Sequence, residues 1–208
     1  MSSFIIKKAS KQAKKLRILL SASSGSGKTM GALKIAYGMC KDWSKICVID
    51  SERGSAGMYA DLGDYNTISL NAPYTPERYI EAITAEDAGM EVIIVDSLSH
   101  EWEGEGGCLE IHAKLGGTFQ NWASVTPRHN KLINKLLTSS AHIICTVRRK
   151  EDYVISTNAA GKAKVEKLGM KEVQREGISY EVDLTFEITN TNHLAIATKD
   201  RTNLFVNT

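Results

Sequence analysis

Leu16-Arg-Ile-Leu-Leu-Ser-Ala-Ser-Ser-Gly-Ser-Gly-Lys-Thr-Met30 is the stretch of sequence that decides the fold. An apolar segment leads into a loop of small residues that ends in Gly27-Lys28-Thr29, and a helical pattern follows. Strand, small-residue loop, Gly-Lys-Thr and helix are the layout of a phosphate-binding P-loop. Small residues let backbone N–H groups surround an anion, and the start of the helix adds the positive end of its dipole.

The loop residues receive individual roles from this layout. We expect Lys28 to reach the β and γ phosphates of a nucleotide and Thr29 to offer its hydroxyl to Mg²⁺. The first position of the motif is Ala22 instead of glycine, a mild departure. The alternative, a turn with an incidental lysine, does not account for the flanking strand and helix. The predicted phosphate-binding residues are Ser24, Gly25, Ser26, Gly27, Lys28, Thr29 and Met30.

Length and composition suit one α/β domain in a chain of 208 residues. The net charge is +2, so the whole molecule is not a strong binder of polyanions, and any nucleic-acid contact must come from a local patch. No apolar run approaches a membrane span and no secretory signal is recognisable. None of the four cysteines forms a C-x-x-C pair, and free thiols within apolar strands suit a reducing compartment, so we expect a cytoplasmic protein without a membrane partner. Residues 1–15 are predicted to be a basic tail, and residues 16–208 a single domain.

Strands and helices alternate along most of the chain. Strands are predicted at 16–21, 45–51, 66–70, 91–96 and 141–147, and helices at 28–41, 76–88 and 122–137. This alternation predicts a mainly parallel sheet flanked by helices. Residues 99–117 are predicted as a polar surface excursion with some helix near 109–114. Residues 180–188 and 193–198 are predicted as two antiparallel strands near the C-terminus.

Carboxylates follow two of the predicted strands. Asp96 ends the most apolar strand, where a Walker B aspartate would hold Mg²⁺ through water together with Thr29. Many P-loop ATPases carry a catalytic glutamate directly after this aspartate, but Ser97 occupies that position here. Glu52, after the second strand, is predicted to face the γ-phosphate instead, because parallel strands end at one edge. The alternative is a solvated glutamate paired with Arg53.

These residues resemble the RecA-type ATPase core. In that family the catalytic glutamate follows the strand after the P-loop helix, and Walker B reads Asp-Ser. Lys199 and Arg201 resemble the Lys-x-Arg finger of the KaiC and DnaB branches, which reaches the nucleotide of the neighbouring subunit. The alternative for this pair is a solvated strand terminus. RecA proteins sense the γ-phosphate with a glutamine, and this chain has Thr146 or Arg148 there.

The whole chain looks like bacteriophage-encoded RecA-like ATPases that are grouped with recombination and single-strand annealing. That resemblance implies ATP and Mg²⁺ as cofactors, a homo-oligomer in ring or filament form, and single-stranded DNA as a partner. It covers about residues 16–205. A phage-encoded protein would act in the host cytoplasm.

A basic segment, predicted as a loop or hairpin insertion over 149–172, stands where that family has its second DNA-binding loop. Residues 148–175 contain eight basic and four acidic side chains, a local charge of +4. The alternative is a solvated hairpin. Tyr153 has an aromatic ring that can stack on a base. The predicted DNA-binding residues are Arg149, Lys150, Tyr153, Lys162, Lys164 and Lys167.

Three functions are consistent with the sequence. The first is an oligomeric, DNA-stimulated ATPase in recombination, annealing or replication. The second is a P-loop kinase of nucleotides or small molecules, with Arg148 and Arg149 as lid residues. The third is a nucleotide-gated DNA-binding or loading module that does not hydrolyse. Cys108, His100 and His112 match no familiar zinc spacing, so no metal site is expected among them.

Overall fold

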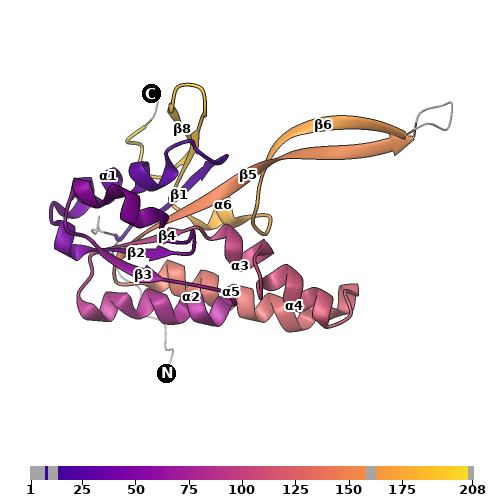
Figure 1. Cartoon of the computed structure of the whole chain (residues 1–208), viewed down its shortest axis with the longest axis horizontal. Coiled ribbons are helices and arrows are strands. Elements are labelled where there is room, and N and C mark those ends of the chain that lie inside the picture. Colours follow the sequence, from indigo (N-terminus) through magenta and orange to yellow (C-terminus); the bar gives the residue numbers. More distant parts are fainter. Residues whose placement is uncertain (1–7, 9–13, 158–162, 206–208) are drawn as a thin grey trace.

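The computed structural model describes residues 8, 14–157 and 163–205, and within these ranges a single sheet of eight strands organises the chain (Figure 1). The strand order is β3–β2–β4–β5–β1–β7–β8, and β6 pairs with β5 outside this path. The strands are β1 Arg17–Ala22, β2 Ile46–Asp50, β3 Asn66–Ser69, β4 Val92–Asp96, β5 His142–Thr157, β6 Ala163–Glu172, β7 Leu184–Ile188 and β8 Ala195–Asp200.

Parallel pairing joins β3, β2, β4, β5, β1 and β7, while β8 runs antiparallel to β7. The predicted α/β fold with C-terminal antiparallel strands is therefore confirmed. The register places Asp50 beside Asp96 and Ala22 beside Arg148. Ala22, Asp50 and Asp96 end their strands, and Arg148 lies level with Ala22 on β5, which continues beyond this edge, so the sheet brings the predicted site together at one edge.

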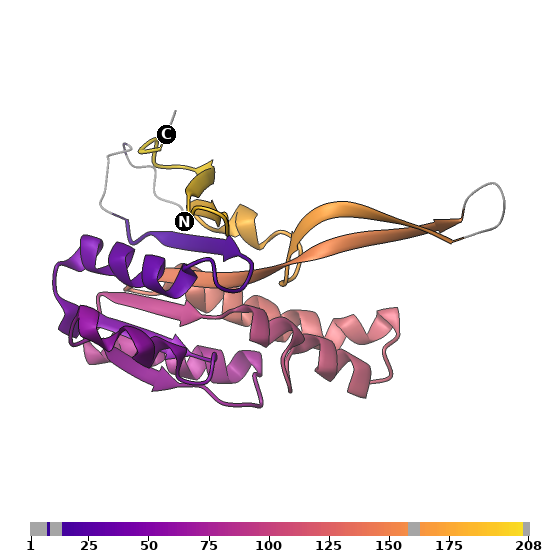
Figure 2. The same cartoon turned by 45° about the horizontal axis from the view of Figure 1, so that its top comes forward.

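Helices cover both faces of the sheet (Figure 2). On one face α1 (Lys28–Cys40) packs its Ala32, Leu33 and Ala36 against side chains such as Ile18 and Ile94. On the other face α2 (Pro76–Ile83), α5 (Trp122–Thr138) and α6 (Ile178–Glu181) pack against the alternate strand residues. Successive strand side chains point to opposite faces, so the continuous apolar runs supply both cores.

Helix α2 begins as predicted. The Thr75 side chain accepts a hydrogen bond from the Arg78 N–H, and Pro76 occupies the first turn. A short 3₁₀ helix, η3 (Thr84–Ala88), continues from α2 and ends at Gly89, which has a left-handed φ of 82°. The other 3₁₀ helices are η1 (Trp43–Lys45), η2 (Ser55–Leu62) and η4 (Phe119–Asn121).

Arg17 ties the start of β1 to the end of α5. Its buried guanidinium donates to the carbonyls of Leu137 (3.0 Å), Ser139 (2.5 Å) and Ala141 (2.8 Å). The last carbonyls of a helix have no partners within it, and Arg17 satisfies some of them. Its own N–H donates to Asp183, which also pairs with Lys14 at the end of the basic tail.

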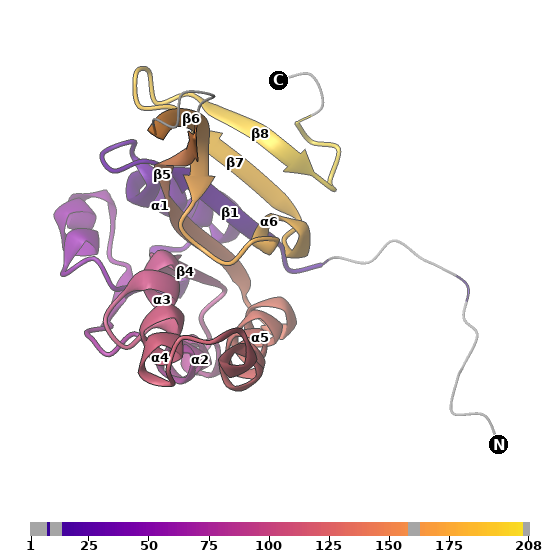
Figure 3. The same cartoon turned by 90° about the vertical axis from the view of Figure 1, so that its right-hand side faces the viewer.

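The basic segment forms a long antiparallel hairpin of β5 and β6 that projects from the body of the protein (Figure 1). β5 continues without interruption from the centre of the sheet into this hairpin. An irregularity in the β5–β6 ladder lies between Asp152 and Tyr153. Viewed along the hairpin, β7 and β8 lie away from the side where α2 and α5 gather (Figure 3).

Two stretches differ from the prediction. The polar excursion is more helical than expected, with α3 (Ser99–Glu103) and α4 (Cys108–Lys114). Tyr180 and Glu181, predicted as strand, belong to α6. Gly177, with a φ of 98°, precedes this short helix. Lys199 on β8 and Arg201 just after β8 donate hydrogen bonds to carbonyls within the helix. None of the described helices is long and apolar enough to cross a membrane.

Candidate active site

The P-loop connects the end of β1 to the start of α1. Gly25 and Gly27 have φ values of 77° and 86°, a region that glycine enters without strain. Lys28 follows at the start of α1, and its Nζ donates to the carbonyls of Ala22 (3.2 Å) and Ser23 (2.7 Å). The ammonium thus lies over the mouth of the loop, where a phosphate would replace these carbonyls as its partner.

The turn between β7 and β8 packs on the P-loop. Asn190 accepts a hydrogen bond from the Ser26 hydroxyl, and His193 Nδ1 lies 3.1 Å from the Ser26 carbonyl. Both residues were missed from the sequence. The sequence offered one indication of them, the polar turn at 189–192. This turn reaches the P-loop because β7 runs parallel to β1 and ends at the same edge of the sheet.

Asp96 is the centre of the predicted magnesium site. Its carboxylate is buried and accepts hydrogen bonds from the hydroxyls of Thr29 (2.6 Å) and Thr146 (2.5 Å). Burial raises the pKa of Asp96, and the hydrogen bonds from Thr146 and Thr29 oppose this rise. A hydroxyl on α1 facing a carboxylate at the end of β4 fits Mg²⁺, whose ligands are oxygens. Thr29 would bind the ion, and Asp96 would hold it through water.

Glu52 makes a two-pronged ion pair with Arg148, and not with Arg53. Arg148 Nε lies 3.0 Å from Glu52 Oε1, and a second N–H of the guanidinium donates to Oε2. Burial acts to raise the pKa of Glu52, but the hydrogen bond and charge of Arg148 outweigh it, so this pKa lies below its usual range. The Asp50 carboxylate fixes the loop by accepting the N–H groups of Glu52 (2.7 Å) and Ala56 (2.9 Å).

The charges of Asp96, Glu52 and Arg148 all influence the pKa of Lys28. Burial lowers the pKa of Lys28, while the negative charges of Asp96 and Glu52 act to raise it and Arg148 acts to lower it. The P-loop lysine, the Walker B aspartate, Glu52 and the predicted sensors Thr146 and Arg148 therefore form one electrostatic unit at the carboxyl edge of the sheet.

His100 is a further polar residue beside Glu52 that sequence reasoning did not place there. Its Nδ1 lies 2.8 Å from the Ser51 hydroxyl, and its ring stacks on Tyr74 at 4.9 Å. Burial lowers the pKa of His100. These side chains, with Glu52 and Arg148, line a cleft of about 640 Å³.

Lys199 and Arg201 lie at the opposite edge of the sheet from their own P-loop. Lys199 Nζ donates to the carbonyls of Ser179 (2.7 Å) and Tyr180 (2.6 Å), and Arg201 also donates to Tyr180. The Arg201 N–H bonds to Asp183, level with the first residue of β1. The structure therefore does not bring these two residues together with Lys28 or Glu52.

The basic residues at the base of the hairpin are held by intramolecular contacts. Arg149 pairs with Glu187 and donates to the Met170 carbonyl (2.8 Å). Lys150 pairs with Glu103 at 2.8 Å and remains largely exposed. For Tyr153, Lys164 and Lys167 only the backbone pairing within the hairpin is described, and Lys162 lies outside the described residues.

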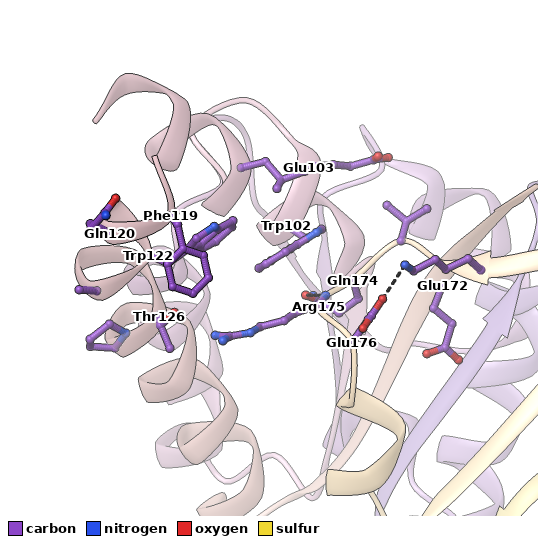
Figure 4. Close-up of a pocket in the computed structure, with 15 residues that line it drawn as sticks. Trp102, Glu103, Phe119, Gln120, Trp122, Thr126, Glu172, Gln174, Arg175 and Glu176 are labelled. Carbon is purple, nitrogen blue, oxygen red and sulfur yellow. Dashed lines mark hydrogen bonds and ion pairs between the residues drawn. The ribbon is translucent and has the colours of Figure 1, made fainter. Parts of the chain in front are cut away.

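A groove of about 950 Å³ separates the exit of the hairpin from α3, α4 and α5 (Figure 4). Trp102 and Trp122 stack at 5.6 Å on one side, and Arg175 reaches in from the other. Phe119, also at the groove, is 87% exposed. Lys171 and Glu176 form an ion pair at its rim. This groove is separate from the cleft beside Glu52.

Comparisons with known proteins agree with this geometry. Residues 14–208 match a protein family described as an AAA domain. No curated protein matches the chain. Among solved structures, the fold is similar to that of the KaiC-like protein PH0186 from the hyperthermophilic archaeon Pyrococcus horikoshii OT3. The TM-score is 0.51, with 15% identity over 92% of this chain and 82% of that chain. Because the family match spans nearly the whole sequence, the chain belongs to this AAA-domain family of P-loop NTPases.

Proposed function

We propose that the protein is an oligomeric, Mg²⁺-dependent ATPase that acts on single-stranded DNA in recombination, annealing or replication. One observation carries the proposal: β5 contributes Thr146 and Arg148 to the nucleotide site and then continues into the basic hairpin. A single strand therefore connects the residues that would contact the nucleotide with the hairpin that would contact DNA. The AAA-domain family and the KaiC-like fold support the nucleotide-binding part of the proposal.

ATP binding exchanges the partners of the site residues. Lys28 leaves the carbonyls of Ala22 and Ser23 for the β and γ phosphates. Mg²⁺ supplies positive charge that stabilises the transferred phosphoryl group. Glu52 orients the attacking water and accepts its proton, for which it must first separate from Arg148. Arg148, once free, points its charge at the γ-phosphate and acts as the sensor.

Lys199 and Arg201 are proposed to complete the site of a neighbouring subunit. They lie level with Arg17, whereas the P-loop follows Ala22 at the other end of β1. A six-residue strand spans about 17–20 Å at ~3.3 Å per residue, too far for either side chain to reach its own nucleotide. A positive charge supplied from a neighbour stabilises the transition state and raises the rate by several orders of magnitude.

The proposed DNA contact rests on charge and shape. The hairpin extends beyond the body of the protein and carries the excess positive charge of residues 148–175. Phosphate contacts by lysine and arginine give affinity that falls as salt rises, without sequence preference. Arg149 and Lys150 must exchange Glu187 and Glu103 for phosphates if they take part.

A kinase is the second candidate, because the cleft beside Glu52 has room for an acceptor molecule. ATP turnover measured alone, with single-stranded DNA, and with a panel of nucleosides separates the two. We expect turnover to rise with DNA and fall with added salt. Turnover that requires a nucleoside acceptor would refute the DNA-dependent ATPase. Tight ATP binding without turnover in any condition would instead favour a non-hydrolysing module.

Variants test the roles within the site. We expect Lys28→Ala to weaken ATP binding, and Glu52→Gln to retain binding while losing hydrolysis. Arg201→Ala should lose turnover and regain it when mixed with Glu52→Gln, because mixed interfaces contain one intact Glu52 facing one intact Arg201. The matched control mixes Arg201→Ala with the double variant Glu52→Gln/Arg201→Ala, which offers no intact finger. Equal activity in both mixtures would exclude a role in trans.

A further inference from the structure

Three potential metal ligands lie together in the interior, away from the P-loop. Glu101 is on α3, Cys108 is the first residue of α4, and His129 is on α5. All three side chains are buried. Glu101 Oε1 lies 3.0 Å from Cys108 Sγ and 3.0 Å from His129 Nδ1, and the ligand atoms are all within 4.8 Å of one another.

We propose that Glu101, Cys108 and His129 bind Zn²⁺. A thiolate, an imidazole and a carboxylate are the ligand types of protein zinc sites, whereas Mg²⁺ and Ca²⁺ select oxygen ligands. This site is independent of the proposed ATPase, whose magnesium ligands lie at the carboxyl edge of the sheet. The ion would link α3, α4 and α5, the three α-helices that lie between β4 and β5 in the sequence.

The distances suit a tetrahedral ion. Bonds of about 2.0–2.3 Å to zinc place two ligand atoms roughly 3.3–3.6 Å apart. The two separations from Glu101 Oε1 are 3.0 Å, a few tenths of an ångström below this range, and the three ligand atoms all lie within 4.8 Å of one another. Three protein ligands leave a fourth position for water. The groove lined by Trp102 and Trp122 lies close to these ligands, because Trp102 and Gln174 both line it (Figure 4). Trp102 contacts His129, and Gln174 donates to Glu101.

Charge favours a cation at this place. In the part of the chain that the structure describes, Glu101 receives hydrogen bonds from Cys108 and Gln174 and contacts His129, but no lysine or arginine bonds to it. A bound cation would supply the positive charge that no lysine or arginine provides to Glu101. Zn²⁺ with one carboxylate, one thiolate and a neutral imidazole has no net charge.

Binding requires a proton to leave. In the structure the Cys108 thiol donates a hydrogen bond to the Glu101 carboxylate. When the sulfur–zinc bond forms, the S–H bond breaks and the proton goes to solvent.

The surroundings orient the ligands. Gln174 Nε2 donates to Glu101 Oε2 (3.2 Å) and to the Leu98 carbonyl (3.0 Å), which links the carboxylate to the exit of the hairpin. The Trp102 ring meets the His129 ring edge-on at 5.6 Å. Such second contacts fix ring and carboxylate orientation in zinc sites. His100 and His112, the histidines near Cys108 in sequence, instead contact Ser51 and Trp122.

The test is a Co²⁺ titration of the full chain, produced without a histidine tag and stripped of metal by a chelator. Co²⁺ bound to a thiolate gives a charge-transfer band in the near ultraviolet. We expect this band to saturate at about one ion per chain and to disappear when Zn²⁺ is added. Absence of the band in the folded wild-type chain would overturn the proposal.

Variants locate the ion. Cys108→Ala should lose the band, while Cys40→Ala, which removes a thiol on α1, should keep it. An undiminished band in Cys108→Ala would place the metal elsewhere and refute the site. If Cys108→Ala fails to fold, His129→Asn decides, because Zn²⁺ should raise the melting temperature of the stripped wild type and not of this variant. An equal rise in both would count against the proposal.

Discussion

The ion pair between Glu52 and Arg148 should stabilise the nucleotide-free protein, and the coupling energy between the two side chains should be measurable. The side chains are 23% and 34% exposed, so the pair lies between the exposed and buried extremes. Exposed pairs couple by about 0.2–1 kcal/mol, whereas breaking a buried pair costs about 3–5 kcal/mol. Two-pronged geometry and partial burial together give an expected coupling of about 1–2 kcal/mol.

The assay is a double-mutant cycle. Unfolding in urea is followed for the wild type, Glu52→Gln, Arg148→Gln and the double variant, without nucleotide. Because the folded-state pKa of Glu52 is lowered, the contribution is present above its unfolded pKa of about 4.3 and is lost as pH falls through the folded value. The coupling should therefore be full at pH 7 and vanish in acid.

An exposed pair on α4 provides the matched control. Lys114 and Glu110 lie 2.5 Å apart, but their side chains are 70% and 36% exposed. We expect little coupling between them at any pH. A coupling between Glu52 and Arg148 as small as that of the control would refute the assignment of Arg148 as the partner that holds Glu52 in the absence of ATP.

Three further variants test the burial and backbone arguments. Asp96→Asn should raise the melting temperature of the nucleotide-free protein by about 2–4 °C at pH 7 while ending Mg²⁺-dependent turnover. The raised pKa of Asp96 means that its stabilising form is the protonated one, lost as pH rises through the folded pKa, and an unchanged melting temperature would contradict this. Arg17→Met should cost about 2–4 kcal/mol of unfolding free energy in urea, because carbonyls of the α5 end lose their donor; a cost below 1 kcal/mol, about that of one ordinary hydrogen bond, would show that water satisfies them. Gly27→Ala should cost about 1–2 kcal/mol at its φ of 86°, whereas Gly38→Ala within α1 should stabilise by about 0.5–1 kcal/mol, and equal effects would argue against strain.

Local signals in the sequence predicted most of the elements. The apolar run ending at Asp96, the P-loop and the start of the helix at Pro76 each depend on neighbouring residues, and each formed as expected. The continuation of β5 through Arg148 and beyond was harder to see, because those residues are basic. Their strand conformation comes from pairing with β6, a contact between segments separated in sequence.

Partners across the fold were beyond sequence reasoning for the same physical reason. The order of strands determines that Arg148 faces Glu52 and that Asn190 meets Ser26, and no periodicity encodes that order. The cluster of Glu101 and His129 likewise joins residues on two helices, 28 positions apart. The chemistry of individual residues therefore suggested which side chains belong to the site, and only the fold showed which of them contact one another.

β5 is also a stiff mechanical connection. Its 16 residues extend about 50 Å at ~3.3 Å per residue, with no loop or helix between the buried half and the projecting half. The irregularity at Asp152 lies beyond Arg148, so bending concentrates outside the nucleotide site. In the proposed ATPase, a displacement of Thr146 or Arg148 during turnover would therefore pass along the backbone of β5 to the residues that pair with β6, and a force on those residues would return along the same strand.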